Sequence, residues 1–378
     1  MTAGDFEHDV TILGGCGRVG LPLGISLAEC GLRVALVDTN AEAVADVQAG
    51  RMPFREADAD GPLSRCVTEG RIWATEDPSA IAGARTVIVV IGTPVDDHLN
   101  PSPDTVLNVI AGVRDHMRAG QLLVLRSTIY PGVTRLVERL VEELSVDVAF
   151  CPERIAEGQA MFELRDLPQI VGARTPDAMR RARELFSLLT DEIVELTPEE
   201  AELAKLFTNA WRYIKFAAAN QFFMIANGYG LDFGRIRDAL AYRYPRAADM
   251  PKAGFAAGPC LLKDTMQLAA FNNNNFTLGH VSMMINEGLP LYVISEVEKR
   301  FDFNEATVGL LGMAFKGGSD DIRDSLSYKL KRILKLKARD VLCTDPYVTV
   351  DPTLRPLEEV LEQADLLVIG APHAEYAE

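Results

Sequence analysis

Short apolar runs alternate with longer amphipathic segments over the first 150 residues of the chain. Buried strands are predicted at Val10–Leu13, Arg33–Asp38, Thr86–Ile91, Gln121–Ser127 and Val146–Phe150. The segments between these runs are long enough to form helices. Such alternation is typical of a doubly wound parallel sheet with helices on both faces. The sequence therefore predicts an α/β fold with a Rossmann-like N-terminal domain.

A long helix is predicted in the middle of the chain. The sequence Thr197-Pro-Glu-Glu200 has the form of a capping box with proline at the first helical position, and the helical pattern continues to about Gly228. Lys205 and Asn209 lie one turn apart on this helix and share a face. A pair with this spacing more often faces solvent, and the pattern leaves that alternative open. The apolar content of Trp211–Ile225 favours a helix buried on several sides, as between domains or subunits.

The pattern changes again in the last quarter of the chain. Helical segments up to about residue 300 are interrupted at Tyr242–Arg246 and around Cys260. A second α/β unit is then predicted, with a strand starting at Thr307 and others at Asp340–Thr344 and Asp365–Ile369. The predicted divisions are an N-terminal domain (1–196), a central helical domain (197–302) and a smaller, Rossmann-like C-terminal domain (303–378).

Charge and cysteine content narrow the class of protein. The 378 residues carry a formal net charge of −16, which disfavours binding to nucleic acid or to anionic membranes. The first residues do not resemble a signal peptide, and no apolar run is long enough to span a bilayer. The six cysteines are scattered without a C-x-x-C pair, which argues against disulfides and a structural zinc site. We therefore expect a cytoplasmic protein without a metal.

A glycine-rich turn follows the first predicted strand. Gly15, Gly17 and Gly20 have the G-x-G-x-x-G spacing, with Arg18 and Val19 inside the turn and a helical pattern directly after it. This spacing permits a tight turn and close approach of the backbone to a pyrophosphate. The next strand ends in Asp38, whose carboxylate suits the ribose hydroxyls of NAD and would repel the 2′-phosphate of NADP. The alternative is a glycine-rich turn without a ligand.

Polar residues follow three of the other predicted strands. They occur in Gly92-Thr-Pro94, in Ser127-Thr-Ile-Tyr-Pro-Gly132 and in Cys151-Pro-Glu-Arg154. Ligands of open α/β sheets bind outside the carboxyl ends of the strands. Thr93, Thr128 and Glu153 are therefore expected where a cofactor and a substrate meet.

One cysteine lies in a loop of small residues. The sequence Gly254-Phe-Ala-Ala-Gly-Pro-Cys260 is followed by Lys263-Asp264, which is a plausible setting for a reactive thiolate. An inert buried cysteine is the alternative. Further along, Lys316 and Arg323 flank a loop between a strand and a helix, and they are candidates for an anion pocket.

Together these motifs resemble the nucleotide-sugar 6-dehydrogenase family, which includes UDP-glucose, GDP-mannose and UDP-N-acetylhexosamine dehydrogenases. The resemblance covers nearly the whole chain, from the glycine turn through Gly92-Thr-Pro94, Pro152-Glu-Arg154 and the cysteine loop to Ala314-Phe-Lys316. It implies NAD as cofactor, a UDP-sugar as substrate and at least a homodimer. It also implies a four-electron oxidation of the sugar C6 alcohol to a carboxylate, by way of a thiohemiacetal and a thioester on cysteine.

The resemblance assigns roles by position. Cys260 would be the nucleophile, with Lys205 and Asn209 stabilising oxyanions. The base could be Asp264 with a water near Thr128, or that duty could fall to Lys205. The remaining implied residues are Glu153 and Glu157 for hydrolysis, Thr93, Pro94 and Thr128 for the cofactor, and Glu153, Lys205, Asn209, Arg243, Arg246, Gly254, Phe255, Lys316 and Arg323 for the substrate. Arg243 or Arg246 would reach a substrate across the subunit interface.

The preferred sugar is less sharply indicated. Arg243–Arg246, Ile129–Gly132 and Pro152–Gly158 are more similar to the N-acetylhexosamine branch, whereas Lys263–Leu268 is more similar to UDP-glucose enzymes. The loop before Cys260 departs from the family pattern, no basic residue clearly follows Asp38, and the end of the C-terminal domain is expected to be shortened. Alternatives are a UDP-glucose 6-dehydrogenase, a two-electron dehydrogenase of the 6-phosphogluconate type, and a catalytically silent nucleotide-sugar binding protein.

Overall fold

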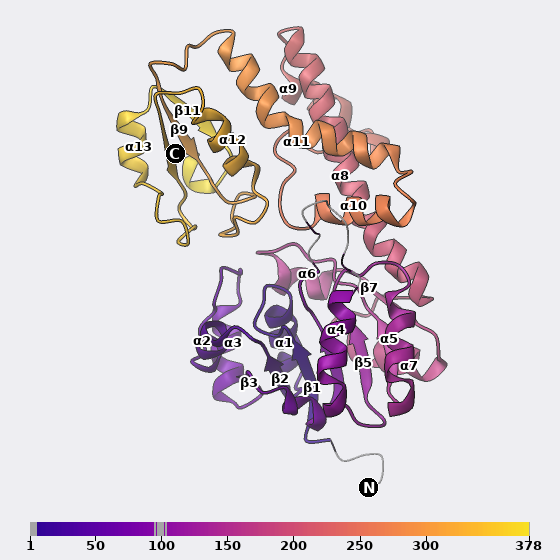
Figure 1. Cartoon of the computed structure of the whole chain (residues 1–378). Helices are drawn as coiled ribbons and strands as arrows, with labels where there is room; N and C mark the ends of the chain where they lie inside the picture. Colours follow the sequence, from indigo (N-terminus) through magenta and orange to yellow (C-terminus); the bar gives the residue numbers. More distant parts are fainter. Residues whose placement is uncertain (1–5, 94–95, 97–101, 103, 378) are drawn as a thin grey trace. The chain divides into compact units, whose positions relative to one another are not determined.

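A computed structural model describes residues 6–93, 96, 102 and 104–377 (Figure 1). The chain forms two compact units, one up to Leu206 and one from Phe207 onward. The boundary falls within the long helix α8, Pro198–Gly228. The division into three domains stays a prediction.

The first unit is built on an eight-stranded sheet with the order β3-β2-β1-β4-β5-β6-β7-β8. Its strands are β1 His8–Leu13, β2 Val34–Val37, β3 Ile72–Thr75, β4 Ala84–Val89, β5 Leu122–Leu125, β6 Asp147–Phe150, β7 Gln169–Ala173 and β8 Ile193–Leu196. All neighbours pair in parallel except β6 and β7, which are antiparallel. The five predicted strands are confirmed, and the sheet is mixed rather than wholly parallel.

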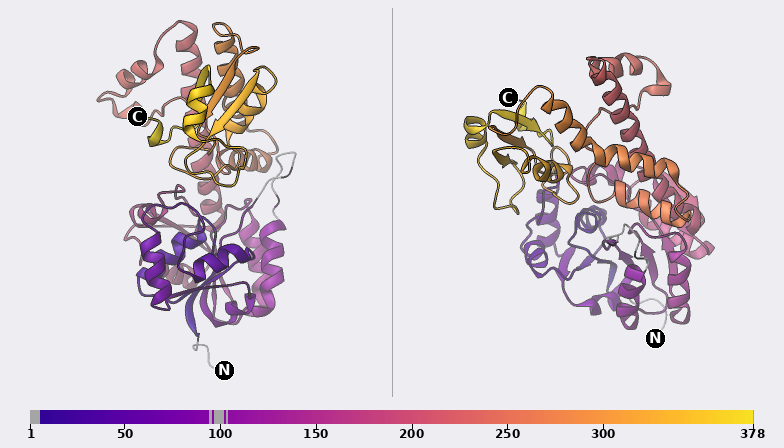
Figure 2. Two further views of the ribbon diagram at one scale, coloured as in Figure 1. Left: turned by 90° about the vertical axis from the view of Figure 1, so that its left-hand side faces the viewer. Right: turned by 45° about the horizontal axis from the view of Figure 1, so that its top comes forward.

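Helices cover both faces of this sheet (Figure 2). They are α1 Gly20–Glu29, α2 Ala41–Gln48, α3 Asp60–Thr68, α4 Asp104–Val113, α5 Val133–Val141, α6 Ala160–Asp166 and α7 Pro176–Phe186. Successive strand residues point to opposite faces, so Ile12 joins the core beneath α1 and Leu13 joins the core beneath α4 and α5. A sheet buried on both faces explains why its inner strands are apolar throughout rather than alternating.

The second unit combines helices with a small sheet. After α8 come α9 Phe233–Ala241, α10 Leu261–Phe271 and α11 Thr277–Glu298. A parallel three-stranded sheet follows, in the order β10-β9-β11. Its elements are β9 Thr307–Leu311, α12 Leu326–Leu334, β10 Asp340–Thr344, α13 Leu357–Gln363 and β11 Leu366–Ile369. Single 3₁₀ segments occur at Pro78–Gly83, Arg114–His116, Glu142–Leu144, Pro245–Ala247 and Ala374–Tyr376.

Helix α8 begins as its capping box predicts. The backbone N–H of Thr197 donates to Oε2 of Glu200 at 2.9 Å, and the N–H of Glu200 donates to Oγ1 of Thr197 at 3.4 Å. The helix ends at Gly228, as predicted. None of the helices in the described ranges is both long and apolar enough to cross a membrane.

Candidate active site

The glycine turn between β1 and α1 needs its glycines for close backbone packing. A Cβ on Gly15 would lie 2.7 Å from the carbonyl oxygen of Ile12, and one on Gly20 would lie 2.4 Å from that of Gly14. The N-cap residue Val19 makes no side-chain hydrogen bond to the first turn of α1. The N–H groups at this helix end therefore suit an anion such as the pyrophosphate of NAD.

Asp38 lies at the end of β2 and is tied to the glycine turn. Its Oδ2 accepts a hydrogen bond of 3.0 Å from the N–H of Cys16, and its Oδ1 accepts one of 3.0 Å from the N–H of Asn40. The carboxylate is therefore held beside the turn at the point where a ribose would follow a pyrophosphate. The guanidinium of Arg18, within the turn, lies 5.0 Å from the centre of the Phe54 ring.

The structure brings Thr93 and Thr128 together at the carboxyl ends of β4 and β5. Oγ1 of Thr93 donates a hydrogen bond of 2.7 Å to the carbonyl oxygen of Thr128. The N–H of Ile91 donates to Oγ of Ser127 at 2.8 Å, which is a second hydrogen bond between the loop after β4 and the loop after β5. These loops lie next to the glycine turn because β1 pairs with β4. Pro94 lies outside the described residues.

Glu153 follows β6 and is held by a buried arginine. Its Oε2 accepts hydrogen bonds from Nη2 and, at 2.8 Å, from Nε of Arg126, whose side chain is fully buried. Its Oε1 accepts from the N–H groups of Arg154 at 2.6 Å and Ile155 at 2.8 Å. The Arg126 guanidinium also stacks 4.8 Å from the Phe186 ring. These contacts hold the Glu153 carboxylate in one position and give it a buried cationic partner.

Arg126 is a site residue that the sequence motifs do not include. The available signal is a basic residue directly after the apolar run Leu122–Leu125, at the carboxyl end of a buried strand. Such a residue must find a partner within the protein, because an isolated buried charge is strongly unfavourable.

Glu157 lies on a loop whose backbone is anchored on both sides. The N–H groups of Gly158 and Ala160 donate to the buried carboxylate of Glu56 at 2.8 and 2.7 Å. On the other side, the N–H of Ala156 donates to Oε2 of Glu163 at 2.5 Å. The loop that carries Glu157 is therefore ordered by acidic side chains from α6 and from the segment before α3.

The first turns of α8 carry two buried charged residues. Glu202 accepts hydrogen bonds from the N–H groups of Gly132 at 2.6 Å and Thr134 at 2.9 Å, and from Oγ1 of Thr134 at 2.6 Å. These contacts cap α5, which follows the loop containing Thr128. Lys205, one turn later, is buried with 8% exposure. The solvent-facing alternative for Lys205 is therefore wrong, and it is also wrong for Asn209, which is 4% exposed.

In the second unit, Asn209 reaches the helix that follows the cysteine loop. Its Nδ2 donates a hydrogen bond of 2.5 Å to Oδ2 of Asp264, which has no solvent exposure. Oδ1 of Asp264 lies 2.8 Å from Nζ of Lys263. Asp264 is in the first turn of α10, and its N–H donates to the carbonyl oxygen of Cys260 at 2.9 Å. Cys260 is the exposed N-cap of α10, where the helix end favours a thiolate.

The other five cysteines are poor nucleophiles. Burial raises the thiol pKa to about 12 in Cys16, where Asp38 adds to the effect, to about 12 in Cys151 and to about 11 in Cys343. Burial also raises the pKa of Cys30 and Cys66. Because only the thiolate attacks carbon, these residues leave Cys260 as the candidate nucleophile.

The cysteine loop packs against the loop that carries the predicted anion-binding residues. The N–H of Gly258 donates to the carbonyl oxygen of Asp324 at 3.4 Å, and a Cβ on Gly258 would lie 2.6 Å from the Phe315 ring. Nζ of Lys316 lies 5.6 Å from the centre of that ring. Arg323 forms a bidentate pair with Asp321, with Nη2 to Oδ2 at 2.6 Å. The loop therefore presents lysine beside the cysteine loop, while Arg323 already has a carboxylate partner.

The remaining predicted substrate residues have different settings. The half-buried side chain of Phe255 packs on the core of the small sheet, and Gly254 is hydrogen-bonded to a side chain of α8. Arg243 and Arg246 are exposed. The guanidinium carbon of Arg243 lies 5.5 Å from the centre of the Tyr242 ring, and that of Arg246 lies 4.5 Å from the centre of the Tyr244 ring. They therefore remain on a surface segment of the second unit.

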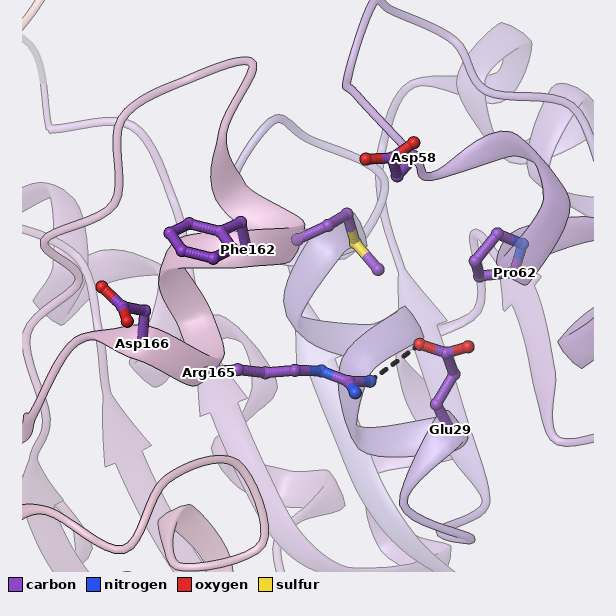
Figure 3. A pocket seen from close by; sticks show the side chains of 7 residues that line it. Glu29, Asp58, Pro62, Phe162, Arg165 and Asp166 are labelled. Atoms are coloured by element: carbon purple, nitrogen blue, oxygen red, sulfur yellow. Dashed lines mark hydrogen bonds and ion pairs between the residues drawn. The ribbon is translucent and has the colours of Figure 1, made fainter.

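A separate hollow of about 430 Å³ opens on the surface of the first unit (Figure 3). Arg165 of α6 extends across it to form an ion pair of 2.9 Å with Glu29 at the end of α1. The hollow is lined by Glu29, Asp58, Pro62, Met161, Phe162, Arg165 and Asp166. None of these residues is among the candidate site residues.

Three family models match successive parts of the chain. The NAD binding domain of the UDP-glucose/GDP-mannose dehydrogenase family matches residues 8–190, its central domain matches 199–287 and its UDP binding domain matches 309–378. The glycine turn and Asp38 fall within the first, and Cys260 and Asp264 fall within the second.

Individual proteins are similar over almost the whole length. The UDP-N-acetyl-D-mannosamine dehydrogenase of Pyrococcus horikoshii is 31% identical over 375 residues, covering 96% of this chain and 89% of the relative. A solved structure of a UDP-D-ManNAc dehydrogenase from that organism has a TM-score of 0.90 at 30% identity, covering 97% of this chain and 90% of that one. The structure of a UDP-glucose dehydrogenase from Pyrobaculum islandicum has a TM-score of 0.89 at 25% identity, covering 100% and 92%.

Proposed function

This chain belongs to the UDP-glucose/GDP-mannose dehydrogenase family of NAD-dependent oxidoreductases, and from this we propose that it oxidises the C6 hydroxyl of a UDP-N-acetylhexosamine to the carboxylate. The observation that carries the proposal is the buried hydrogen bond from Asn209 on α8 to Asp264 in the first turn of α10, the helix whose N-cap residue is Cys260. An exposed thiol at a helix N-terminus, followed by a buried carboxylate one turn later, suits covalent capture of an aldehyde.

The proposed reaction uses the thiol of Cys260 to retain the intermediate. Bound NAD⁺ would accept a hydride from C6 in each of two oxidations. After the first, the thiolate sulfur adds to the aldehyde carbon and gives a thiohemiacetal. Loss of a second hydride gives a thioester, water adds to its carbonyl carbon, and the C–S bond breaks to release the thiolate and the sugar carboxylate. Each alcohol oxidised thus consumes one water and two NAD⁺, and it forms one carboxylate, two NADH and three protons that leave to solvent.

The predicted catalytic residues supply groups for the charges that develop in this reaction. One N–H of the Asn209 amide donates to Asp264, and its second N–H would donate to an oxyanion at C6, as would the ammonium of Lys205. Asp264, held between Asn209 and Lys263, would accept a proton through a water near Thr128. Glu153 and Glu157 would line the site for the hydrolytic step.

We assign the cofactor and substrate contacts by the same reasoning. The turn containing Gly15, Gly17, Arg18, Val19 and Gly20 would hold the pyrophosphate, Asp38 would bind the adenosine ribose, and Thr93, Pro94 and Thr128 would lie along the cofactor. Gly254, Phe255, Lys316 and Arg323 would contact the nucleotide sugar, with Arg243 or Arg246 supplied by the second subunit. For Arg323 to bind a phosphate, its pair with Asp321 must open or be shared.

An N-acetylated sugar is favoured over glucose. The chain is similar to UDP-N-acetyl-D-mannosamine dehydrogenases of several organisms, and this similarity supports that substrate. UDP-N-acetyl-D-glucosamine, which differs from it only in configuration at C2, is the other N-acetylated candidate. UDP-glucose is the second candidate, because a UDP-glucose dehydrogenase has almost the same fold. The proposed place of action is the cytoplasm, in the synthesis of sugar acids for polysaccharides.

A homodimer is proposed from an apolar surface on the second unit. A groove of about 240 Å³ runs along α8 and α9. Its exposed apolar side chains are Phe222, Ile225, Tyr229, Leu231, Ile236 and Leu240. A contiguous apolar patch of this kind marks an interaction surface. A second copy of the chain is the proposed occupant, since one self-complementary helical surface is sufficient for a twofold dimer.

The test is the number of NADH molecules formed per sugar consumed. Wild type and Cys260→Ser are compared with UDP-N-acetylmannosamine, UDP-N-acetylglucosamine and UDP-glucose. We expect two NADH per sugar in wild type, and loss of complete turnover in the variant. One NADH per sugar, or indifference to the substitution, would overturn the thioester route, and no turnover with any sugar would favour a silent binding protein.

A further inference from the structure

A buried amide on α8 holds the start of the cysteine loop. The side chain of Asn220 has no solvent exposure. Its Oδ1 accepts a hydrogen bond of 2.9 Å from the N–H of Gly254, and its Nδ2 donates one of 3.0 Å to the carbonyl oxygen of the same residue. One side chain therefore satisfies both backbone polar groups of Gly254, as a neighbouring strand would.

A second amide fixes the orientation of the first. Nδ2 of Asn286, on α11, donates a hydrogen bond of 3.0 Å to the carbonyl oxygen of Tyr213. Its Oδ1 must then be the atom that faces Asn220, and it accepts from Nδ2 of Asn220 at 2.9 Å. Nδ2 of Asn220 donates both of its hydrogens, one to Asn286 and one to the carbonyl oxygen of Gly254. Its Oδ1 is therefore the atom that accepts from the N–H of Gly254. The network has a single consistent arrangement of donors and acceptors.

The two hydrogen bonds between Asn220 and Gly254, here called the clamp, lie at one end of the short segment 254–260 that leads to Cys260. Gly254 is attached to α8 through Asn220, and Phe255 packs on the core of the small sheet. Gly258, two residues before Cys260, is attached by the hydrogen bond from its N–H to the carbonyl oxygen of Asp324. A loop fixed at both ends presents its thiol in one position, whereas a loop fixed at one end samples many.

We propose that Asn220 is a positioning residue for the nucleophile. Its clamp on Gly254 sets the path of residues 254–260 and so the place of the Cys260 thiol. The proposal rests on the proposed function in one respect, that Cys260 reacts with the sugar. It does not require Asn220 to touch substrate or cofactor, and the cofactor turn lies in the other unit of the chain.

The test uses two substitutions that keep the number of side-chain heavy atoms, and a control on the same helix. Asn220→Asp retains an acceptor for Gly254 but loses both donors, and Asn220→Leu loses all the hydrogen bonds. Asn227→Ala is the control, because Asn227 lies two turns later on α8 and donates to the hydroxyl of Tyr292 rather than to the loop. Thermal melting establishes whether each variant is folded. If Asn220→Leu does not fold, Asn220→Asp alone tests the proposal.

We expect kcat to fall at least tenfold in both Asn220 variants, with KM for NAD within twofold of wild type. Hydrogen exchange over residues 253–260, measured by mass spectrometry, should be at least tenfold faster than in wild type. Asn227→Ala should change neither quantity by more than twofold. The proposal is overturned if a folded Asn220 variant keeps its kcat within twofold, or if the control loses as much.

The exchange measurement separates this proposal from the proposed function. If wild type reduces no NAD with any UDP-sugar while exchange of the loop still accelerates in Asn220→Asp, the dehydrogenase function fails and the clamp stands. If wild type turns over and neither exchange nor kcat responds to the substitution, the clamp fails and the dehydrogenase function stands.

Discussion

Nδ2 of Asn209 donates a hydrogen bond of 2.5 Å to Oδ2 of Asp264, and neither side chain is more than 4% exposed. The carboxylate is therefore screened from bulk water and compensated within the protein, by this amide and by the ammonium of Lys263. A buried carboxylate is tolerated only where such partners replace the hydrogen bonds and the charge stabilisation that water would give it. The pair links α8, which carries Lys205, to α10, which begins after Cys260.

Replacing Asp264 by asparagine should abolish most turnover without removing the cofactor. The amide has the volume of the carboxylate, but it can neither accept a proton nor neutralise Lys263. We expect kcat to fall by about 10²- to 10⁴-fold, the range for loss of a general acid or base. NAD affinity, measured by fluorescence titration, should be unchanged because the glycine turn belongs to the other unit. A kcat within tenfold of wild type would exclude Asp264 from proton transfer.

The buried pair of Arg126 and Glu153 should matter much more for stability than an exposed pair. Substituting Arg126 by methionine leaves the carboxylate of Glu153 buried without its cation, which costs about 3–5 kcal/mol. The matched change, Arg165→Met, removes an ion pair to Glu29 in which the arginine side chain is 50% exposed (Figure 3). Exposed pairs contribute about 0–1 kcal/mol.

Urea denaturation followed by tryptophan fluorescence measures both variants in a Trp211→Phe background, so that the signal comes from Trp73 in β3 of the first unit. Comparable losses in the two variants would show that the Arg126 network contributes no more than a surface contact. Glu153→Gln should restore part of the stability lost in Arg126→Met, since it removes the uncompensated charge.

Asp38 should determine the choice between NAD and NADP. Its carboxylate lies at the end of β2 and is attached to the glycine turn through Cys16. A 2′-phosphate placed there would meet a negative charge, so wild type should strongly prefer NAD. Asp38→Asn should raise KM for NAD by about tenfold, the effect of losing one charge-assisted hydrogen bond, and should narrow the NAD/NADP ratio of kcat/KM. An unchanged ratio would exclude this role.

Local patterns in the sequence predicted the elements, and they could not predict the contacts that join distant elements. Apolar runs marked β1, β2, β4, β5 and β6, and the capping box marked the start of α8. Strands β3, β7 and β8 were not predicted, because their apolar runs are short: Ile-Trp-Ala in β3 and Ile-Val in β7 and in β8. These elements form through pairing with their neighbours rather than through a strong local signal.

The candidate site shows the same limit. Glycine spacing located the cofactor turn, and the cysteine loop was recognisable from its small residues. The residues that anchor the site were not predicted: Arg126 binds Glu153, Glu202 caps α5, and Asn220 binds Gly254 across 34 residues of sequence. A polar residue in a helix has the same local appearance whether it faces solvent or a buried backbone group. Only the packing of the chain distinguishes the two cases.

Acid should weaken the C-terminal sheet through Asp345, at the end of β10. Burial alone would raise the pKa of this carboxyl, but hydrogen bonds from His373 and from the N–H groups of Ala314 and Tyr347 outweigh it and lower the pKa to about 2. The unfolded chain has the ordinary value of 3.8. A lowered folded-state pKa stabilises the protein above the unfolded pKa, and this contribution is lost as pH falls through the folded value.

The expected contribution of Asp345 is about 2 kcal/mol near pH 6, roughly half of it lost at pH 3. Wild type and Asp345→Asn are compared in urea at both pH values, with hydrogen exchange over residues 307–318 reporting on β9 and the loop after it. The stability difference between them should shrink on acidification. Asp340→Asn, at the exposed start of the same strand, is the control and should give a small difference at both pH values. A difference for Asp345→Asn that is equally large at pH 6 and pH 3 would show that the hydrogen bonds around Asp345 do not depend on its charge.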